Sequence, residues 1–149
     1  MNLKKDSFLQ GKKYQIVKVS GQGGFGITYR AKQVALNRRV AIKEFFMKTL
    51  CNRDDATSQV TVGSAGSLET VEKFRQKFIK EALNISEFNH PNSIRIDYVF
   101  EENDTAYYVM EYINGINLKE FLNNSGGRLD EATVLGLMKP VFESLFQIH

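Results

Sequence analysis

The sequence is poor in the features that mark secreted, metal-binding and membrane-spanning proteins. Among 149 residues there is one cysteine, Cys51, so the chain can form no internal disulfide. No Cys/His cluster has the spacing of metal ligands. No apolar run is long enough to span a bilayer, and the lysines near the start are not followed by the apolar segment of a secretory signal. These absences favour a reducing, cytoplasmic environment.

What the sequence does contain fits one globular domain, because 42% of its residues are hydrophobic and 25% are charged. The charge is distributed unevenly. Residues 1–50 carry eleven Lys/Arg and two Asp/Glu, whereas residues 51–149 carry nine and fifteen. A basic first third could attract nucleic acid or a polyphosphate ligand, or it could be an ordinary solvated surface. Charge alone leaves these alternatives open.

Hydrophobic periodicity predicts three strands, a polar loop, a helix, two further strands and C-terminal helices. The predicted strands cover residues 14–20, 27–31, 39–46, 93–100 and 106–112. We expect a long loop over residues 49–68, because this stretch is polar and rich in Gly, Ser and Asp, and residues 59–62 could form a short extended piece within it. Apolar residues at helical spacing from Val71 to Ile85 predict the main helix, which should end before Pro91. Two further helices are predicted over residues 118–122 and 130–149, with Asp130 as an N-cap and Pro140 as a kink.

A glycine cluster separates the first two predicted strands. It reads Gly21-x-Gly23-x-x-Gly26, and glycines leave room for backbone N–H groups to approach a phosphate. One alternative is a dinucleotide-binding turn, but that motif requires a helix directly after the glycines. Residues 27–29 are β-branched or aromatic, which counts against a helix there. The other alternative, a plain hairpin tip, stays open on the glycines alone.

Two charged residues downstream could complete a phosphate site. Because side chains alternate along a strand, Ala41 and Lys43 share one face, where a flat base could lie against Ala41 with its phosphates near Lys43. The alternative is an exposed strand lysine. Glu81 lies beside the apolar stripe of the main helix and could reach inward to pair with Lys43. It could also be a solvated helix residue, and Glu72 and Glu87 are competing candidates for the pairing.

Taken together, these segments resemble the protein kinase family, and bacterial Ser/Thr kinases in particular. The resemblance covers roughly residues 8–149 and rests on GQGGFGITY, VAIK, FIKEA, HPNSI and YYVMEYINGINL, in that order. It implies an α+β fold. We expect an N-terminal lobe over residues 1–113, with a five-stranded antiparallel sheet, one main helix and the ATP site. Residues 114–149 would form the first helices of an incomplete C-terminal lobe.

The resemblance also assigns roles, with ATP and Mg²⁺ as the expected cofactors. The phosphate-binding set would be Gly21, Gly23, Gly24, Phe25 and Gly26, together with Lys43 and its partner Glu81. The adenosine-binding set would be Ser20, Thr28, Ala41, the gatekeeper Met110, the Glu111 carbonyl, the Ile113 amide and, near the ribose, Asn117. Three positions depart from the family pattern. Ser20 and Thr28 make the adenine slot more polar than the usual leucine and valine, and Asn117 replaces an acid.

Two family motifs are missing from the sequence. It contains neither HRD nor DFG, which carry the catalytic aspartate and the Mg²⁺ ligands of kinases. In the family, a helix like that predicted over residues 130–149 leads into the catalytic loop. We therefore expect a piece of a longer enzyme that phosphorylates Ser or Thr of proteins, while this chain alone binds ATP weakly and transfers no phosphate.

Several alternatives for partners follow from the same residues. A pseudokinase-like module that binds nucleotide or a protein is the main alternative to an active enzyme. Nucleic-acid binding rests only on the basic first third, and we expect none. The last predicted helix has a wide apolar face, so we expect the chain to form a homo-oligomer or this helix to dock elsewhere.

Overall fold

The computed structural model describes residues 1–148, with side-chain environments up to Phe146, and it contains two compact units. Unit 1 comprises Met1–Glu87 and Arg95–Tyr112. Unit 2 comprises Phe88–Ile94 and the chain from Ile113 onward. The assignment of residues 1–113 as an ATP-binding lobe stays a prediction.

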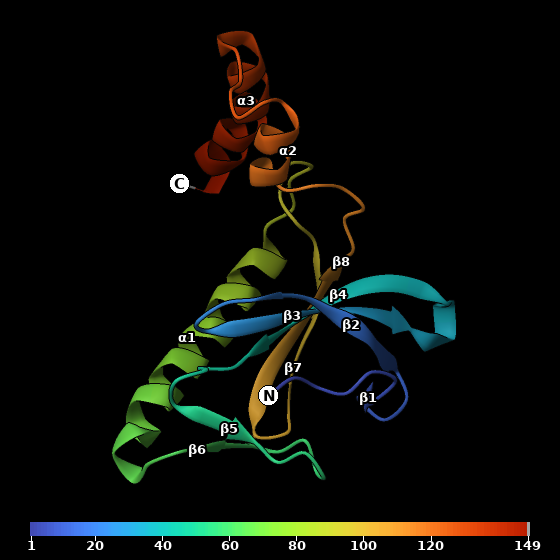
Figure 1. Cartoon of the computed structure of the whole chain (residues 1–149), viewed down its shortest axis with the longest axis vertical. Helices are drawn as coiled ribbons and strands as arrows, with labels where there is room; N and C mark the ends of the chain where they lie inside the picture. The colour runs from blue at the N-terminus through green and yellow to red at the C-terminus, as the bar shows by residue number, and fades with distance from the viewer. Residues whose placement is uncertain (149) are drawn as a thin grey trace. The chain divides into compact units, whose positions relative to one another are not determined.

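Unit 1 is built on one antiparallel sheet of six strands, in the order β1-β2-β3-β4-β8-β7 (Figure 1). The strands are β1 Phe8–Leu9, β2 Tyr14–Gln22, β3 Gly26–Gln33, β4 Arg38–Phe45, β7 Ile96–Glu102 and β8 Thr105–Glu111. The α+β fold and its five predicted strands are confirmed. Strand β1 is an addition that periodicity could not reveal, because it has two residues.

Burial alternates along β3 and β4, so the sheet has two distinct faces. On the face that we call the Glu44 face, Glu44 lies opposite Ile27 and Tyr107. Most of the hydrophobic core of the unit packs on this face. Its buried members on the strands of this sheet include Tyr14, Ile16, Ile27, Tyr29, Ala31, Val40, Ile42, Phe100, Tyr107 and Val109. The other face, here the Lys43 face, carries mainly half-buried side chains, while Phe45 and Ala106 on it are buried. The predicted placement of Ala41 and Lys43 on one face is confirmed, with Val40 and Ile42 buried on the other.

The main helix, α1, covers part of the Lys43 face. It spans Leu68–Glu87 and contacts β7 and β8. The ring of Phe78 on α1 lies 5.7 Å from the ring of Phe45 and 5.1 Å from that of Tyr108, between ring centroids. The helix ends before Pro91, as predicted.

The loop predicted over residues 49–68 is wrong in part, although the short extended piece considered at residues 59–62 does form a strand. This stretch forms a two-stranded hairpin, β5 Cys51–Arg53 and β6 Val60–Val62, followed by a 3-10 turn, Ala65–Ser67. A second 3-10 turn, Val34–Leu36, joins β3 to β4. Each strand of the hairpin has three residues, too few for a visible alternation. The hairpin is fixed by tertiary contacts, since Cys51 and Val60 join the core.

Unit 2 contains two helices, α2 Leu118–Asn124 and α3 Glu131–Ile148. Asp130 caps α3 as predicted, because its Oδ1 accepts a hydrogen bond from the Thr133 amide at 2.7 Å. Pro140 lies inside α3, and His149 lies outside the described residues. Among helices over residues 1–148, none combines the length and apolarity that a bilayer crossing requires.

Helix α3 exposes much of its apolar surface within unit 2. Its exposed large hydrophobic side chains are Val134, Leu135, Leu137, Val141, Phe142, Leu145 and Phe146. Self-association through this surface stays a prediction.

Candidate functional site

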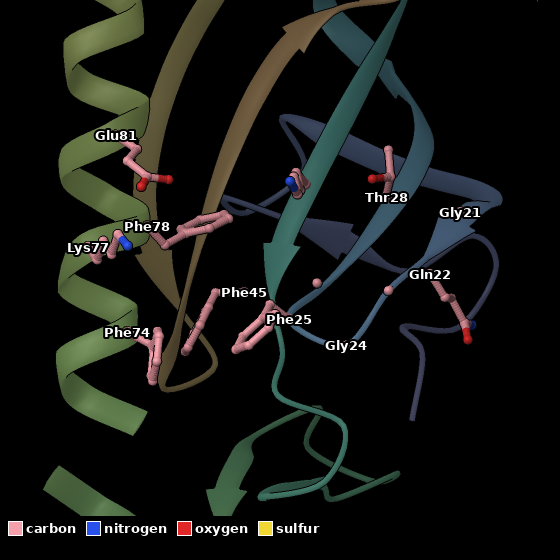
Figure 2. Close-up of a pocket in the computed structure, with 13 residues that line it drawn as sticks. Gly21, Gln22, Gly24, Phe25, Thr28, Phe45, Phe74, Lys77, Phe78 and Glu81 are labelled. Carbon is pink, nitrogen blue, oxygen red and sulfur yellow. The ribbon is translucent and has the colours of Figure 1, made fainter. Parts of the chain in front are cut away.

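A cavity of about 610 Å³ lies in unit 1 between the glycine loop, β4 and α1 (Figure 2). It brings together eight of the residues predicted for the nucleotide site. These are Gly21, Gly23, Gly24, Phe25, Gly26, Thr28, Lys43 and Glu81. The cavity is therefore built from three segments that are far apart in sequence.

The strand register explains how the glycine loop meets Lys43. Thr28 on β3 pairs with Gly21 on β2 and with Lys43 on β4. Lys43 in turn pairs with Tyr108 on β8. Directly paired residues of antiparallel strands point to the same face, so this row carries the loop, a hydroxyl and an ammonium on the Lys43 face.

Among the loop glycines that line the cavity, Gly26 alone has close neighbours where a side chain would begin. A Cβ on Gly26 would lie 3.0 Å from the Glu44 carbonyl oxygen and 3.4 Å from Cε of Lys43. A Cβ on Gly21, Gly23 or Gly24 would have no neighbour within 4 Å. A side chain at position 26 would therefore press against β4. The other glycines leave open space on the loop, which a ligand can approach.

Lys43 and Glu81 line the same cavity, from β4 and α1, but do not form an ion pair. Among ion pairs of the described residues, none within 4.0 Å involves Lys43. The Lys43 ammonium instead lies 6.0 Å from the centroid of the Tyr108 ring. Burial and, after it, the charge of Glu81 raise the pKa of Tyr108, so Glu81 acts on this part of the cavity. Pairing of Lys43 with Glu81 in a ligand complex stays a prediction.

The residues predicted around the adenine are only partly brought together. Ala41 pairs with Met110 across β4 and β8, so these two side chains are neighbours on the Lys43 face. Glu111 follows at the end of β8, where its amide donates to the Arg95 carbonyl oxygen at 3.1 Å. Ser20 donates through its hydroxyl to the Thr28 carbonyl oxygen at 3.3 Å.

The last two predicted residues, Ile113 and Asn117, belong to unit 2, and the structure does not test their place at the nucleotide. The side-chain oxygen of Asn117 already has a partner, because it caps α2 by accepting from the Glu120 amide at 2.8 Å. A ribose contact would compete with this cap.

Five cavity residues were missed from the sequence. They are Gln22, Phe45, Phe74, Lys77 and Phe78. The helical ones carried a usable signal, since residues 74, 77, 78 and 81 share one face of α1. The ring of Phe25 at the loop tip lies 5.5 Å from that of Phe74, so the loop tip touches α1. Lys77 adds a second ammonium to the cavity wall.

The donors of the cavity suit phosphate groups. Backbone N–H groups of the glycine loop and the two lysines are complementary to a polyphosphate. For Mg²⁺, which usually takes one or two carboxylates plus phosphate oxygens, the cavity offers one carboxylate, that of Glu81. Over the part of the chain that the structure describes, no group of three or more His, Cys, Asp or Glu could hold a metal ion.

Comparisons with known proteins agree on one family. The protein kinase domain matches residues 14–149. PrkC of Bacillus subtilis, a serine/threonine-protein kinase, is 31% identical over 137 residues, which cover 92% of this chain and 18% of PrkC. PknD of Chlamydia trachomatis, also a serine/threonine-protein kinase, is 26% identical over 139 residues, covering 89% of this chain and 13% of PknD.

Two solved structures share the fold of this chain. PpkA-294 in its apo form superposes with a TM-score of 0.88 at 30% identity, covering 96% of this chain and 50% of that one. A mutant of the PknI kinase domain of Mycobacterium tuberculosis has a TM-score of 0.73 at 17% identity, covering 100% and 52%. The chain thus spans about half of these solved chains and less than a fifth of the curated relatives. The matched family domain extends over most of the sequence, and the chain belongs to the protein kinase family.

Proposed function

We propose that this chain binds ATP in the cavity of unit 1, as part of a kinase that transfers the γ-phosphate to Ser or Thr of proteins. The observation that carries the proposal is Lys43. It lies in one cavity with the glycine loop and has no ion-pair partner among the described residues. A half-buried lysine that forms no ion pair favours an anionic ligand. The relatives PrkC and PknD, both serine/threonine-protein kinases, support the reaction type.

Each group of residues would have its own part in holding the nucleotide. The glycine loop would cover the phosphates with backbone N–H groups, and Lys43 would hold the α- and β-phosphates, with Glu81 orienting its ammonium. Ala41 and Met110 would contact the adenine. The Glu111 carbonyl, the Ile113 amide, Asn117 and the more polar pair Ser20 and Thr28 would complete the adenosine site. Bound Mg²⁺ would neutralise phosphate charge.

We further propose that the 149-residue chain alone binds ATP weakly and transfers no phosphate. Phosphoryl transfer depends on positioning and on electrostatic stabilisation of the transferred group. The sequence supplies residues that hold the nucleotide, but not the HRD and DFG motifs. Transfer to Ser or Thr by the purified chain would overturn this part of the proposal.

A thermal-shift titration with Mg-ATP tests the binding proposal. We expect ATP to raise the melting temperature of the unmodified chain, and the shift to be largely lost in Lys43→Met. Lys80→Met is the matched control, because Lys80 is an exposed α1 lysine that does not line the cavity. Equal shifts in all three proteins would contradict the proposal, since the site would then not depend on Lys43.

A second candidate is a non-catalytic module that binds nucleotide or a protein, as pseudokinases do. The exposed apolar side chains of α3, such as Leu135 and Phe142, favour it, because such patches commonly mark contact surfaces. This candidate predicts a mass above 17.0 kDa by light scattering, reduced to that of one chain by Leu135→Glu. We also propose a cytoplasmic location, which the single buried thiol of Cys51 supports.

A further inference from the structure

A buried ion pair lies behind Lys43, on the opposite face of β4. It joins Glu44 to Arg53 of β5, and the two side chains are 0% and 1% exposed. The other guanidinium nitrogens of Arg53 also have partners. Nε donates to the Met1 carbonyl oxygen and Nη1 to the Ser58 carbonyl oxygen, both at 2.8 Å. Arg53 therefore ties together the N-terminal segment, the β5–β6 hairpin and β4.

Glu44 is held from the sheet as well as from the hairpin. The Tyr29 hydroxyl donates to its Oε1 at 2.9 Å and accepts from the Leu3 amide at 3.0 Å. Burial and, after it, the charge of Glu44 raise the pKa of Tyr29, which keeps this hydroxyl protonated as a donor. Burial disfavours a charged Arg53, but the neighbouring Glu44 carboxylate outweighs it and raises the pKa of the guanidinium. The Glu44–Arg53 ion pair is thus held in place by hydrogen bonds from several segments of unit 1.

The residues directly after Glu44 hold the glycine loop. The Phe46 amide donates to the Phe25 carbonyl oxygen at 3.0 Å, and the Lys48 amide donates to the Gly24 carbonyl oxygen at 3.3 Å. Residues 44–48 are therefore the support on which the tip of the loop rests. The guanidinium of Arg53 lies 5.4 Å from the centroid of the Phe46 ring.

We propose that Arg53 is a positioning residue for the glycine loop. It fixes Glu44 by the ion pair and Phe46 by the cation–π contact with its ring, and Phe46 and Lys48 then fix the loop through their amides. Arg53 itself does not line the cavity. An arginine suits this place because its planar fork directs three nitrogens to three different partners, whereas a lysine offers one nitrogen. The consequence for nucleotide binding rests on the proposed function, but the restraint on the loop does not.

Hydrogen exchange on the nucleotide-free chain tests the restraint directly. In Arg53→Lys, which keeps a counter-charge for Glu44, we expect the amides of Phe46 and Lys48 to exchange about tenfold faster or more. The Ile42 amide, in the middle of β4, should change little. Equal acceleration at all three amides would indicate a general loss of stability and would overturn the proposal.

Arg75→Lys is the matched control, because it likewise replaces a guanidinium that binds carboxylates, at another place in unit 1. Arg75 makes two hydrogen bonds to Glu72, both at 3.0 Å, and an ion pair with Glu101 at 3.0 Å. No hydrogen bond or ion pair among the described residues joins its side chain to the loop or to residues 44–48, so the Phe46 and Lys48 amides should not change. If Arg53→Lys does not fold, Phe46→Leu removes the ring contact together with some core packing, because Phe46 is buried in the core, and it should still accelerate the Phe46 and Lys48 amides more than the Ile42 amide.

Binding measurements extend the test to the ligand. The loop would contact phosphates and not adenine, so Arg53→Lys should raise the Kd for Mg-ATP about fivefold and leave that for adenosine unchanged. A parallel rise for adenosine, or unaltered ATP binding despite faster exchange, would overturn the link to the ligand. If the unmodified chain binds neither ligand, the proposed function fails, while the exchange data still decide the role of Arg53.

Discussion

The two faces of β4 use charge in opposite ways. Glu44 and Lys43 are neighbours in sequence, yet Glu44 is fully buried and paired with Arg53, whereas Lys43 lines a cavity with no carboxylate within 4.0 Å among the described residues. A charge with a buried partner fixes the fold, and removing that partner is costly. A charge without a buried partner lowers the stability of the fold, but it remains available to bind a ligand of opposite charge. The difference separates the part of unit 1 that holds the sheet together from the part that binds.

The largest effect should come from removing one carboxylate charge on each face. In Glu44→Gln we expect the free energy of unfolding to fall by about 3 kcal/mol or more, because a buried guanidinium loses its counter-charge. In Glu81→Gln we expect a change within about 0.5 kcal/mol, since Glu81 is exposed and has no ion pair in the described chain. Urea unfolding of both variants measures the two changes in the free energy of unfolding. Equal losses would contradict the difference between the two faces.

Local periodicity explains what the sequence could predict. Alternation along residues 39–46 separated Lys43 from the core, and helical spacing placed Glu81 on the side of α1 that meets the sheet. The glycine loop was visible for the same reason, because its spacing is contained in six residues. These patterns depend only on neighbours along the chain.

What could not be predicted depends on contacts between distant segments. The hydrogen bond from the Leu3 amide to the Tyr29 hydroxyl joins residues 26 positions apart, and no local sequence pattern predicts it. Arg53 stood in a polar stretch without periodicity, where a solvated loop was the reasonable interpretation. Its burial becomes visible only when the hairpin is folded against β4 with Glu44 inside. The residues on the phosphate side of the cavity were thus predictable from the sequence. The buried ion pair behind them was not.

An intermediate effect is expected from removing one hydroxyl on each face. Tyr29→Phe deletes the donor to Glu44 and the acceptor of the Leu3 amide, so we expect a loss of about 1–3 kcal/mol in the free energy of unfolding. Tyr108→Phe should change it by less than about 0.5 kcal/mol, because no hydrogen bond of that hydroxyl is seen among the described residues. Thermal unfolding measures both changes in stability. A larger loss of stability in Tyr108→Phe than in Tyr29→Phe would contradict the conclusion that the Glu44 face holds the sheet together.

The smallest effect concerns a charge that faces the cavity from α1. Lys77 lines the cavity beside Phe78, as Figure 2 shows, whereas Lys73 on the same helix does not. If ATP binds as proposed, Lys77→Met should raise the Kd for Mg-ATP about two- to fivefold, the size expected for one partly solvated charge, and Lys73→Met should leave it unchanged. Isothermal titration calorimetry on the two variants provides the comparison.

Ionic strength distinguishes a contact of Lys77 with the ligand from a structural effect. An exposed ammonium acting on phosphate is screened by salt, so the difference between Lys77→Met and the unmodified chain should shrink from low salt to about 0.5 M salt. An effect through the packing of α1 would persist at high salt, and so would one transmitted through Phe78 and Phe45. If the difference in Kd does not depend on salt, or if Lys73→Met has an equal effect, Lys77 does not contact the bound nucleotide. Lys43 would then be the only cavity lysine acting on the nucleotide.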